Sequence, residues 1–197
     1  MKTESTSAAA REWKLSRLLE GIEGVEAVTG GGTVVTALAY DSRRVRPGAL
    51  FFALAGETTD GRLHIEEAVR RGAVAILHEG PLNGLRGLPA VRAQNARAAM
   101  GDISARFYGE PSRALRVIGI TGTNGKTTTA FMVRDILREA GLPASLIGTV
   151  YHEYGGRRIA ASRTTPESPD LQQMLAESRQ AGDQAVAMEV SSQGLAA

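Results

Sequence analysis

The chain has no cysteine, and only three of its 197 residues are lysine. The lack of cysteine excludes disulfide bonds, thiolate metal sites and a thiol nucleophile. No run of eighteen apolar residues occurs, so we expect no insertion into a membrane. The formal net charge of +2 is too small for the electrostatic footprint of a nucleic-acid-binding protein. With 43% hydrophobic and 22% charged residues, the composition is that of a globular protein. Residues 1–12 have no apolar region of the kind that a signal peptide needs, so we expect the protein in the cytoplasm, which the lack of cysteine permits.

The first part of the chain predicts a small α/β domain. Residues 1–14 are mostly small and polar, and we expect a disordered leader there. From residue 15 to residue 110, short apolar runs alternate with helical patterns. We expect strands at 34–40, 50–54, 73–77 and 88–91, and helices at 63–71 and 96–108. Residues 109–112 contain glycine and proline, which break both periodicities, and we interpret them as a linker.

Residues 113–197 have a different pattern, typical of a parallel sheet with helices on both faces. We expect strands at 116–121, 144–149 and 184–190, the first of them buried. Helices are expected at 126–140 and 168–181, the second capped by Ser168 with Pro169 at its first position. Residues 151–158 predict a hairpin that turns at Gly155-Gly156. Three parallel strands are few for such a sheet, so we expect either part of a longer protein or a small domain completed by a partner.

The clearest motif lies between the first strand and the first helix of this second part. Residues 119–128 read GITGTNGKTT, which resembles a phosphate-binding loop. Glycines allow backbone N–H groups to approach a phosphate closely, and the helix N-terminus adds positive potential. Lys126 would neutralise the β- and γ-phosphates of ATP, and the Thr127 hydroxyl would ligate Mg²⁺. The expected ATP-binding residues are Gly122, Thr123, Asn124, Gly125, Lys126, Thr127 and Thr128.

The spacing of the glycines departs from two standard patterns. A strict G-x-x-x-x-G-K-[ST] motif needs glycine at position 120, where this chain has isoleucine. The glycines at 119, 122 and 125 also fail the dinucleotide pattern G-x-G-x-x-G, which disfavours NAD and FAD. The alternative is a glycine-rich turn that binds nothing.

The distribution of lysine supports the phosphate-loop interpretation. From residue 15 onward Lys126 is the only lysine, although arginine occurs throughout the chain. A guanidinium is broad and planar, whereas an ammonium is compact and has rotatable donors. Only the compact group suits the inside of a closed backbone loop, so we expect the lysine at position 126 to contact phosphate.

Five segments carry a resemblance to a known family. Residues 121–128 read TGTNGKTT, as does the phosphate loop of the Mur ligases of peptidoglycan synthesis. Four further segments occur in the family's order, namely 41–43 (DSR), 56–61 (GETTDG), 163–166 (RTTP) and 188–192 (MEVSS). From residue 15 to residue 197 the chain resembles this family, and within it the ligases that add the third amino acid of the stem peptide.

The resemblance implies an ATP-dependent ligase that extends UDP-MurNAc-L-Ala-D-Glu through an acyl phosphate. Tyr40, Ser42 and the loop at residues 57–59 would hold the uridine end of this substrate. Thr164, Thr165 and Ser191 would contact the UDP-MurNAc-dipeptide. Glu189 would bind Mg²⁺ together with Thr127, and Lys126 and Glu189 would be the catalytic residues.

Simpler roles remain open for these positions. The DSR segment could be an ordinary polar turn, and the two threonines could cap the following helix. A buried carboxylate without a partner is costly, which favours a metal ligand at Glu189 over a structural salt bridge. His64, His78 and His152 show no ligand spacing, and we expect them on the surface or in packing roles.

The chain also departs from the family. The family commonly has histidine where this chain has Gln193, and its amino-acid-binding domain would lie beyond residue 197. We therefore expect these 197 residues alone to be inactive, and both diaminopimelate and lysine remain possible as the added amino acid. The alternatives are another Mur-type ligase, a folylpolyglutamate synthetase-like enzyme and a non-catalytic nucleotide-binding remnant.

Overall fold

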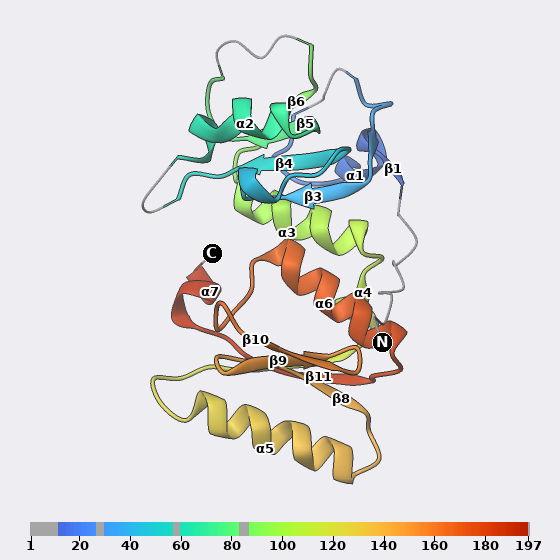
Figure 1. Ribbon diagram of the computed structural model, residues 1–197, viewed down its shortest axis with the longest axis vertical. Helices are drawn as coiled ribbons and strands as arrows, with labels where there is room; N and C mark the ends of the chain where they lie inside the picture. Colours follow the sequence, from blue (N-terminus) through green and yellow to red (C-terminus); the bar gives the residue numbers. More distant parts are fainter. Residues whose placement is uncertain (1–11, 27–29, 57–59, 83–86, 197) are drawn as a thin grey trace, which may run out of the picture. The chain divides into compact units, whose positions relative to one another are not determined.

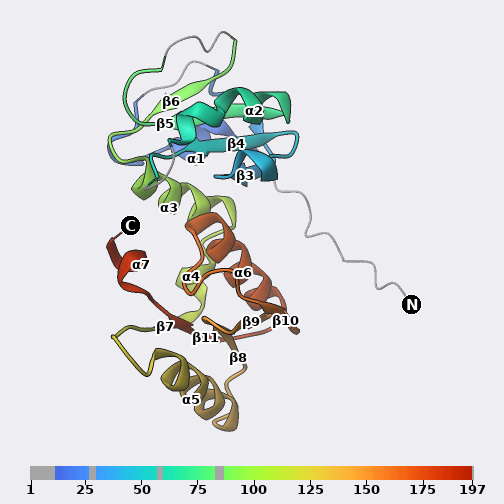
Figure 2. The ribbon, with the colours of Figure 1, turned by 60° about the vertical axis from the view of Figure 1, so that its left-hand side comes forward.

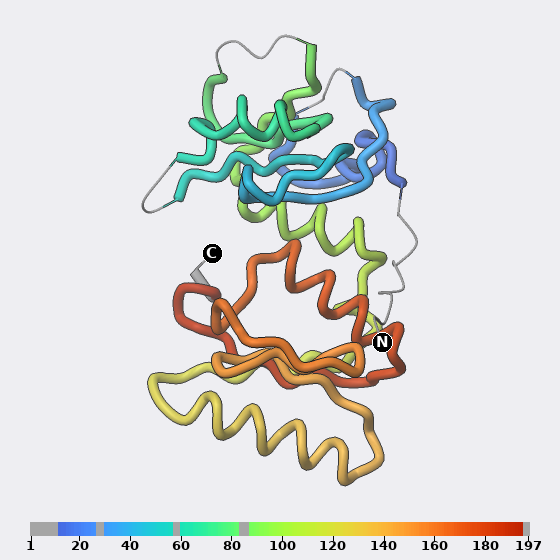
Figure 3. The backbone as a smooth tube through the Cα atoms, viewed as in Figure 1, coloured from blue at the N-terminus to red at the C-terminus, as the bar shows by residue number. Residues whose placement is uncertain are grey.

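A computed structural model describes residues 12–26, 30–56, 60–82 and 87–196. The chain divides into two compact units, Met1–Ile103 and Ser104–Ala197, and each is described by itself (Figures 1 and 3). The expected leader lies outside the described residues up to position 11, but Trp13–Lys14 form strand β1. Within the described part of the chain, no helix has the length and apolar character needed to cross a membrane.

The first unit contains short helices, an antiparallel strand pair and a parallel sheet. Its strands are β1 (Trp13–Lys14), β2 (Val34–Val35), β3 (Ala37–Ala39), β4 (Ala49–Ala53), β5 (Ala73–His78) and β6 (Ala90–Arg92). Its helices are α1 (Leu15–Leu19), η1 (Ser42–Arg44), η2 (Gly61–His64), α2 (Ile65–Arg70) and α3 (Ala96–Phe107), the last of which crosses the unit boundary. These include the strands and helices expected there, whereas α1 and η1 were not predicted.

A four-stranded parallel sheet in the order β3-β4-β5-β6 forms the centre of the first unit. All five residues of β4 are buried, as are five of the six in β5, because helices cover both faces of a parallel sheet. Figures 1 and 2 show α2 and α3 on opposite faces of this sheet. The core includes Phe51 and Ile76 from the sheet and Ile65 from α2.

Two sequence expectations for the first unit need correction. The single strand expected at 34–40 is broken at Thr36, whose N–H donates to the carbonyl oxygen of Gly48. Its two halves join different sheets, since β2 pairs with β1 and β3 pairs with β4. The helix expected at 63–71 begins instead as the 3₁₀ turn η2, with Asp60 accepting a hydrogen bond from the N–H of Arg62.

The second unit has the elements predicted for an α/β domain. Its strands are β7 (Arg116–Ile120), β8 (Ala144–Ile147), β9 (Tyr151–Tyr154), β10 (Arg157–Ala160) and β11 (Ala185–Glu189). Its helices are α4 (Pro111–Ala114), α5 (Lys126–Glu139), α6 (Ser168–Gln180) and α7 (Ser192–Ala196). α4 and α7 were not predicted, and α4 begins at Pro111 inside the expected linker.

The five strands of the second unit form one sheet in the order β10-β9-β8-β11-β7. β11 pairs in parallel with both β7 and β8, while β9 and β10 form the predicted antiparallel hairpin. The two turn glycines, Gly155 and Gly156, have φ angles of 58° and 72°. Figures 1 and 2 show α5 and α6 on opposite faces of this sheet. The predicted α/β fold with parallel strands is therefore confirmed.

Two details of the second unit differ from the expectation. β7 is not a buried strand, because β11 lies between it and β8 and leaves β7 at an edge of the described sheet. Val117 in β7 is accordingly 38% exposed. Helix α6 begins at Ser168 with Glu167 as its N-cap, so Ser168 is the first helical residue rather than the cap.

Candidate functional site

The loop between β7 and α5 has the backbone geometry of an anion site. Gly122 and Gly125 have φ angles of 144° and 77°, a region that other residues rarely adopt. Gly125 is the N-cap of α5, so the first amide groups of a 14-residue helix face the loop. The positive end of the helix dipole is at the same place. A phosphate bound here would meet N–H groups that no Cβ atom shields.

Lys126 is the first residue of α5. Its Nζ donates to the carbonyl oxygen of Gly122 at 2.6 Å and contacts that of Thr123 at 3.4 Å. The ammonium group therefore lies against the loop backbone, within reach of any anion that the loop holds. The contact with phosphate that the distribution of lysine suggests stays a prediction.

Glu189 ends β11 and is fully buried. Its Oε2 accepts hydrogen bonds of 2.9 Å from the hydroxyls of Thr127 and Thr149, and its Oε1 accepts one of 2.8 Å from the Thr149 N–H. Among the described residues its partners are thus neutral donors, not the basic side chain of a structural salt bridge. A buried carboxylate without a counter-charge suits a cation.

The donor set at Glu189 fits Mg²⁺. A carboxylate and a threonine hydroxyl are the hard oxygen ligands that this ion prefers. In the part of the chain that the structure describes, no group of three acidic, histidine or cysteine residues could hold a metal. A divalent ion here would therefore take its remaining ligands from water and from the phosphates of a nucleotide, as Mg²⁺ commonly does.

Gly148 and Thr149 belong to this site, although no sequence motif marks them. They follow β8 directly, and β8 is parallel to β11. The carboxyl ends of parallel strands meet at one edge of a sheet, which is where open α/β sheets bind ligands. That rule could have identified both residues once 144–149 was predicted to be a strand.

The three residues expected to contact the dipeptide substrate also lie beside Glu189. Thr164 Oγ1 is 3.1 Å from Thr149 Oγ1. Thr165 Oγ1 accepts from the Ser191 N–H at 2.9 Å and lies 3.1 Å from the Glu189 carbonyl oxygen. The N-cap of α6 has no side-chain hydrogen bond. These contacts join Thr164 to Thr149, just after β8, and Thr165 to the end of β11.

Tyr40 and Ser42 lie in the first unit, directly after β3. Ser42 is buried, and its hydroxyl donates to Glu67 Oε2 at 2.7 Å. Asp41 caps η1 by accepting from the N–H of Arg43, so the DSR segment is an ordered turn. Arg44 Nη1 lies 3.3 Å from the Tyr40 hydroxyl. The remaining residues expected at this site, 57–59, lie outside the described residues.

We predict a pH-dependent contribution of Glu67 to the stability of the Ser42 turn. Hydrogen bonds from Ser42 and Arg71 hold the pKa of Glu67 below its usual value. A lowered pKa stabilises the fold fully above the ordinary glutamate pKa of about 4.3, and this contribution disappears as the pH falls through the lower folded value. Melting temperatures of the wild type and Glu67→Gln should therefore differ near neutral pH and converge in acid. A constant difference across that range would contradict the prediction.

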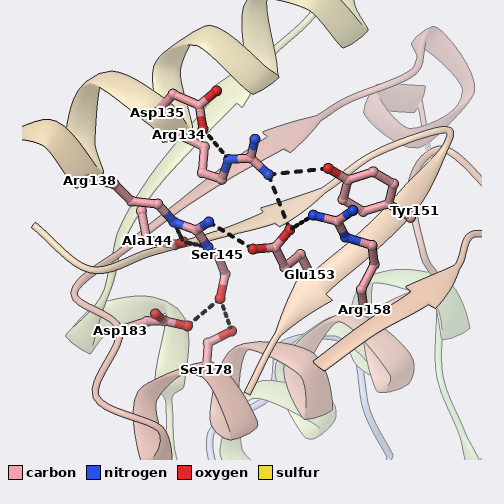
Figure 4. A network of polar contacts seen from close by, with 10 residues as sticks. All are labelled: Arg134, Asp135, Arg138, Ala144, Ser145, Tyr151, Glu153, Arg158, Ser178 and Asp183. Atoms are coloured by element: carbon pink, nitrogen blue, oxygen red, sulfur yellow. Dashed lines mark hydrogen bonds and ion pairs between the residues drawn. The ribbon is translucent and has the colours of Figure 1, made fainter. Parts of the chain in front are cut away.

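A network of charged side chains attaches α5 to the sheet of the second unit (Figure 4). Glu153 on β9 accepts from Arg134 at 3.2 Å, from Arg138 at 2.7 Å and from Arg158 at 2.8 Å. Burial opposes ionisation of Glu153, but the arginines outweigh it and lower its pKa. Because α5 begins at the phosphate loop, this network helps to fix the direction of the helix that carries Lys126.

The histidines and Gln193 lie apart from these contacts. His64 is exposed, whereas His78 and His152 are buried in strands β5 and β9, where burial lowers the pKa of each imidazole. Gln193 is an exposed residue of α7. The structure thus gives the two buried histidines packing positions in separate sheets.

Comparison with known proteins identifies both parts of the chain. The model of the Mur ligase family, catalytic domain, matches residues 34–108, and the Mur ligase middle domain matches residues 120–197. Two curated relatives are named UDP-N-acetylmuramoyl-L-alanyl-D-glutamate–2,6-diaminopimelate ligase. The one from Geobacillus kaustophilus is 46% identical over 182 residues, which are 92% of this chain and 37% of the relative. The one from Geobacter metallireducens is 45% identical over 161 residues, 82% of this chain and 32% of the relative.

Solved structures support the same fold. A structure of a UDP-N-acetylmuramoyl-L-alanyl-D-glutamate–2,6-diaminopimelate ligase matches with a TM-score of 0.73 at 23% identity, over 94% of this chain and 37% of that one. MurF from Acinetobacter baumannii matches with a TM-score of 0.64 at 24% identity, over 92% of this chain and 36% of that one. The chain spans about a third of the length of the curated relatives it matches. Since the two family models cover both of its parts, the chain belongs to the Mur ligase family.

Proposed function

We propose that this chain provides the UDP-sugar-binding domain, residues 15–110, and the first part of the ATP-binding domain, residues 113–197, of a peptidoglycan precursor ligase. The ligase adds the third amino acid to UDP-MurNAc-L-Ala-D-Glu. The observation that carries the proposal is the arrangement of the loop at 122–128 beside the buried Glu189, whose carboxylate accepts from Thr127 at 2.9 Å. The names of the curated relatives favour diaminopimelate over lysine as the added amino acid.

The proposed residues have separate roles in the formation of an acyl phosphate. The loop amides and Lys126 bind the phosphates of ATP and stabilise negative charge on the transferred phosphoryl group. Thr127 and Glu189 would hold Mg²⁺, which would offset the charge of the β- and γ-phosphates. Thr164, Thr165 and Ser191 orient the dipeptide carboxylate, which attacks the γ-phosphate and releases ADP, and Tyr40 and Ser42 bind the uridine end. ATP and UDP-sugars are cytoplasmic, so we place the activity in the cytoplasm.

ATP binding to Lys126 variants tests the proposal. Lys126→Ala should weaken ATP binding by about 10- to 100-fold, because it removes a charge-assisted hydrogen bond to phosphate. Lys126→Arg should not reach the wild-type affinity for ATP either, since a planar guanidinium does not fit where the ammonium lies. Titration calorimetry with purified chain measures each dissociation constant.

Lys14→Ala is the matched control, because Lys14 is an exposed residue of β1 in the other unit. It should bind ATP as the wild type does. An unchanged affinity in Lys126→Ala would overturn the phosphate-loop assignment, and so would an equal loss in both alanine variants.

A further inference from the structure

Among the described residues, Thr149 makes two of the three hydrogen bonds that the Glu189 carboxylate accepts. Its backbone N–H donates to Oε1 at 2.8 Å, and its hydroxyl donates to Oε2 at 2.9 Å. One residue therefore holds both oxygens of the carboxylate, which fixes the plane of the carboxylate as well as its position. The third hydrogen bond comes from Thr127, the residue proposed to ligate the metal.

The backbone at Gly148, directly before Thr149, passes very close to the Glu189 carboxylate. A Cβ atom at Gly148 would lie 2.3 Å from Glu189 Oε1. Gly148 does not have a positive φ, so glycine is needed here for space and not for backbone conformation. The absence of a side chain at 148 lets the chain pass close enough for the Thr149 N–H to reach Oε1.

The donor capacity of a hydroxyl determines the direction of the next contact. A threonine hydroxyl has one hydrogen, and in the 2.9 Å contact with Glu189 Oε2 that hydrogen comes from Thr149. In the 3.1 Å contact between Thr149 and Thr164, the hydrogen then comes from Thr164. Thr164, Thr149 and Glu189 form a directed chain in which the Thr164 oxygen keeps its acceptor capacity toward substrate.

We propose that Thr149 is a positioning residue, which holds the Glu189 carboxylate for the divalent cation of bound ATP and connects it to Thr164. This inference rests on the proposed function and deepens it. Hydrogen bonds to a ligating carboxylate fix its orientation, and their loss commonly costs 10- to 100-fold in metal affinity. If Thr127 ligated the metal, the two hydrogen bonds from Thr149 would remain to hold both oxygens of Glu189.

The test is the Mg²⁺ dependence of ATP binding to the 197-residue chain. Thr149→Val removes the hydroxyl but keeps the N–H and the branched shape, whereas Thr149→Ser keeps both donors. With Mg²⁺, Thr149→Val should bind ATP about 10-fold more weakly than the wild type, and Thr149→Ser should bind it normally. With EDTA, all three proteins should have the same affinity, because the phosphate loop itself is unchanged.

Two controls separate a positioning role from a structural one. Thr129→Val, at an exposed position on α5 outside the Glu189 contacts, should match the wild type in both conditions. In a Glu189→Gln background, Thr149→Val should have less effect, since a residue that acts through another is not additive with it. If the circular dichroism of Thr149→Val differs from that of the wild type, Thr149→Ala takes its place. It should show the same Mg²⁺-dependent loss of ATP affinity.

The possible results distinguish a failure of the proposed role of Thr149 from a failure of the proposed function. Equal affinities of Thr149→Val and wild type in Mg²⁺ would overturn the inference alone. A loss of the same size in Mg²⁺ and EDTA would also overturn it, because a general structural defect does not depend on the metal. A wild-type chain that binds ATP without any Mg²⁺ dependence would overturn the proposed metal site and this inference with it.

Discussion

Alanine at position 148 should lower the free energy of unfolding of the second unit by about 3 kcal/mol. The added Cβ would lie 2.3 Å from Glu189 Oε1. That carboxylate is fully buried and is held by Thr127 and Thr149. It can move away from the new methyl group only by giving up hydrogen bonds to a buried charge. The same displacement should abolish the effect of Mg²⁺ on ATP binding, because the proposed metal ligand is no longer in place.

Scanning calorimetry measures the effect, which should appear as a fall of roughly 15 °C in the melting temperature of the second unit. Fluorescence of Trp13, the chain's single tryptophan, follows the first unit separately. Gly32→Ala is the matched control, because a Cβ at Gly32 meets no atom within 4 Å. If Gly148→Ala is as stable as this control, Glu189 is not confined as the structure indicates.

Replacing Glu153 with leucine should also destabilise the second unit, by about 3 kcal/mol. Glu153 pairs with three arginines, and the side chain of Arg134 is only 8% exposed. Arg138 and Arg158 are more exposed and can be hydrated when Glu153 is absent, but Arg134 would keep a buried charge with one fewer partner. Removing one member of a buried ion pair costs far more than the net stabilisation that the pair provides.

A second substitution tests this explanation. Adding Arg134→Met to Glu153→Leu removes the buried charge, so the double variant should recover at least half of the lost stability in urea unfolding. Glu139→Leu, at an exposed position at the end of α5, should change stability by less than about 0.5 kcal/mol. If the double variant is less stable than Glu153→Leu, the cost does not come from an unpaired Arg134.

Much of the fold could be predicted because its local signals are strong. The alternation of apolar runs with helical patterns predicted the α/β class, and Gly155-Gly156 predicted the hairpin. The wrong predictions concern features that depend on which distant strands pair with each other. Sequence alone does not say that β11 lies between β8 and β7, and this insertion is what places β7 at an edge. Nor could it show that Thr36 bonds to Gly48 and divides a strand between two sheets.

The candidate site was predicted as separate motifs rather than as one arrangement. The loop around Lys126 carries its own signal, because glycines, lysine and threonine occur in a fixed order. The position of Glu189 followed from the end of a strand and from the resemblance to the family. Thr149 was missed because its role depends on two strands, β8 and β11, that are about 40 residues apart in the chain. Its position at the end of an expected strand made Thr149 a candidate, but only the pairing of β8 with β11 shows that Glu189 is its partner.

Lys126 donates to the carbonyl oxygens of its own loop, and this has a consequence for ligand choice. An ammonium group has three hydrogens, so Lys126 keeps one donor for a ligand, and a ligand that takes a second one must displace a loop carbonyl oxygen. A carbonyl oxygen carries only a partial charge, whereas a polyphosphate offers several full ones. We therefore expect the loop to prefer triphosphates over nucleosides and monophosphates, because a ligand of high charge competes best with the carbonyl oxygens of the loop.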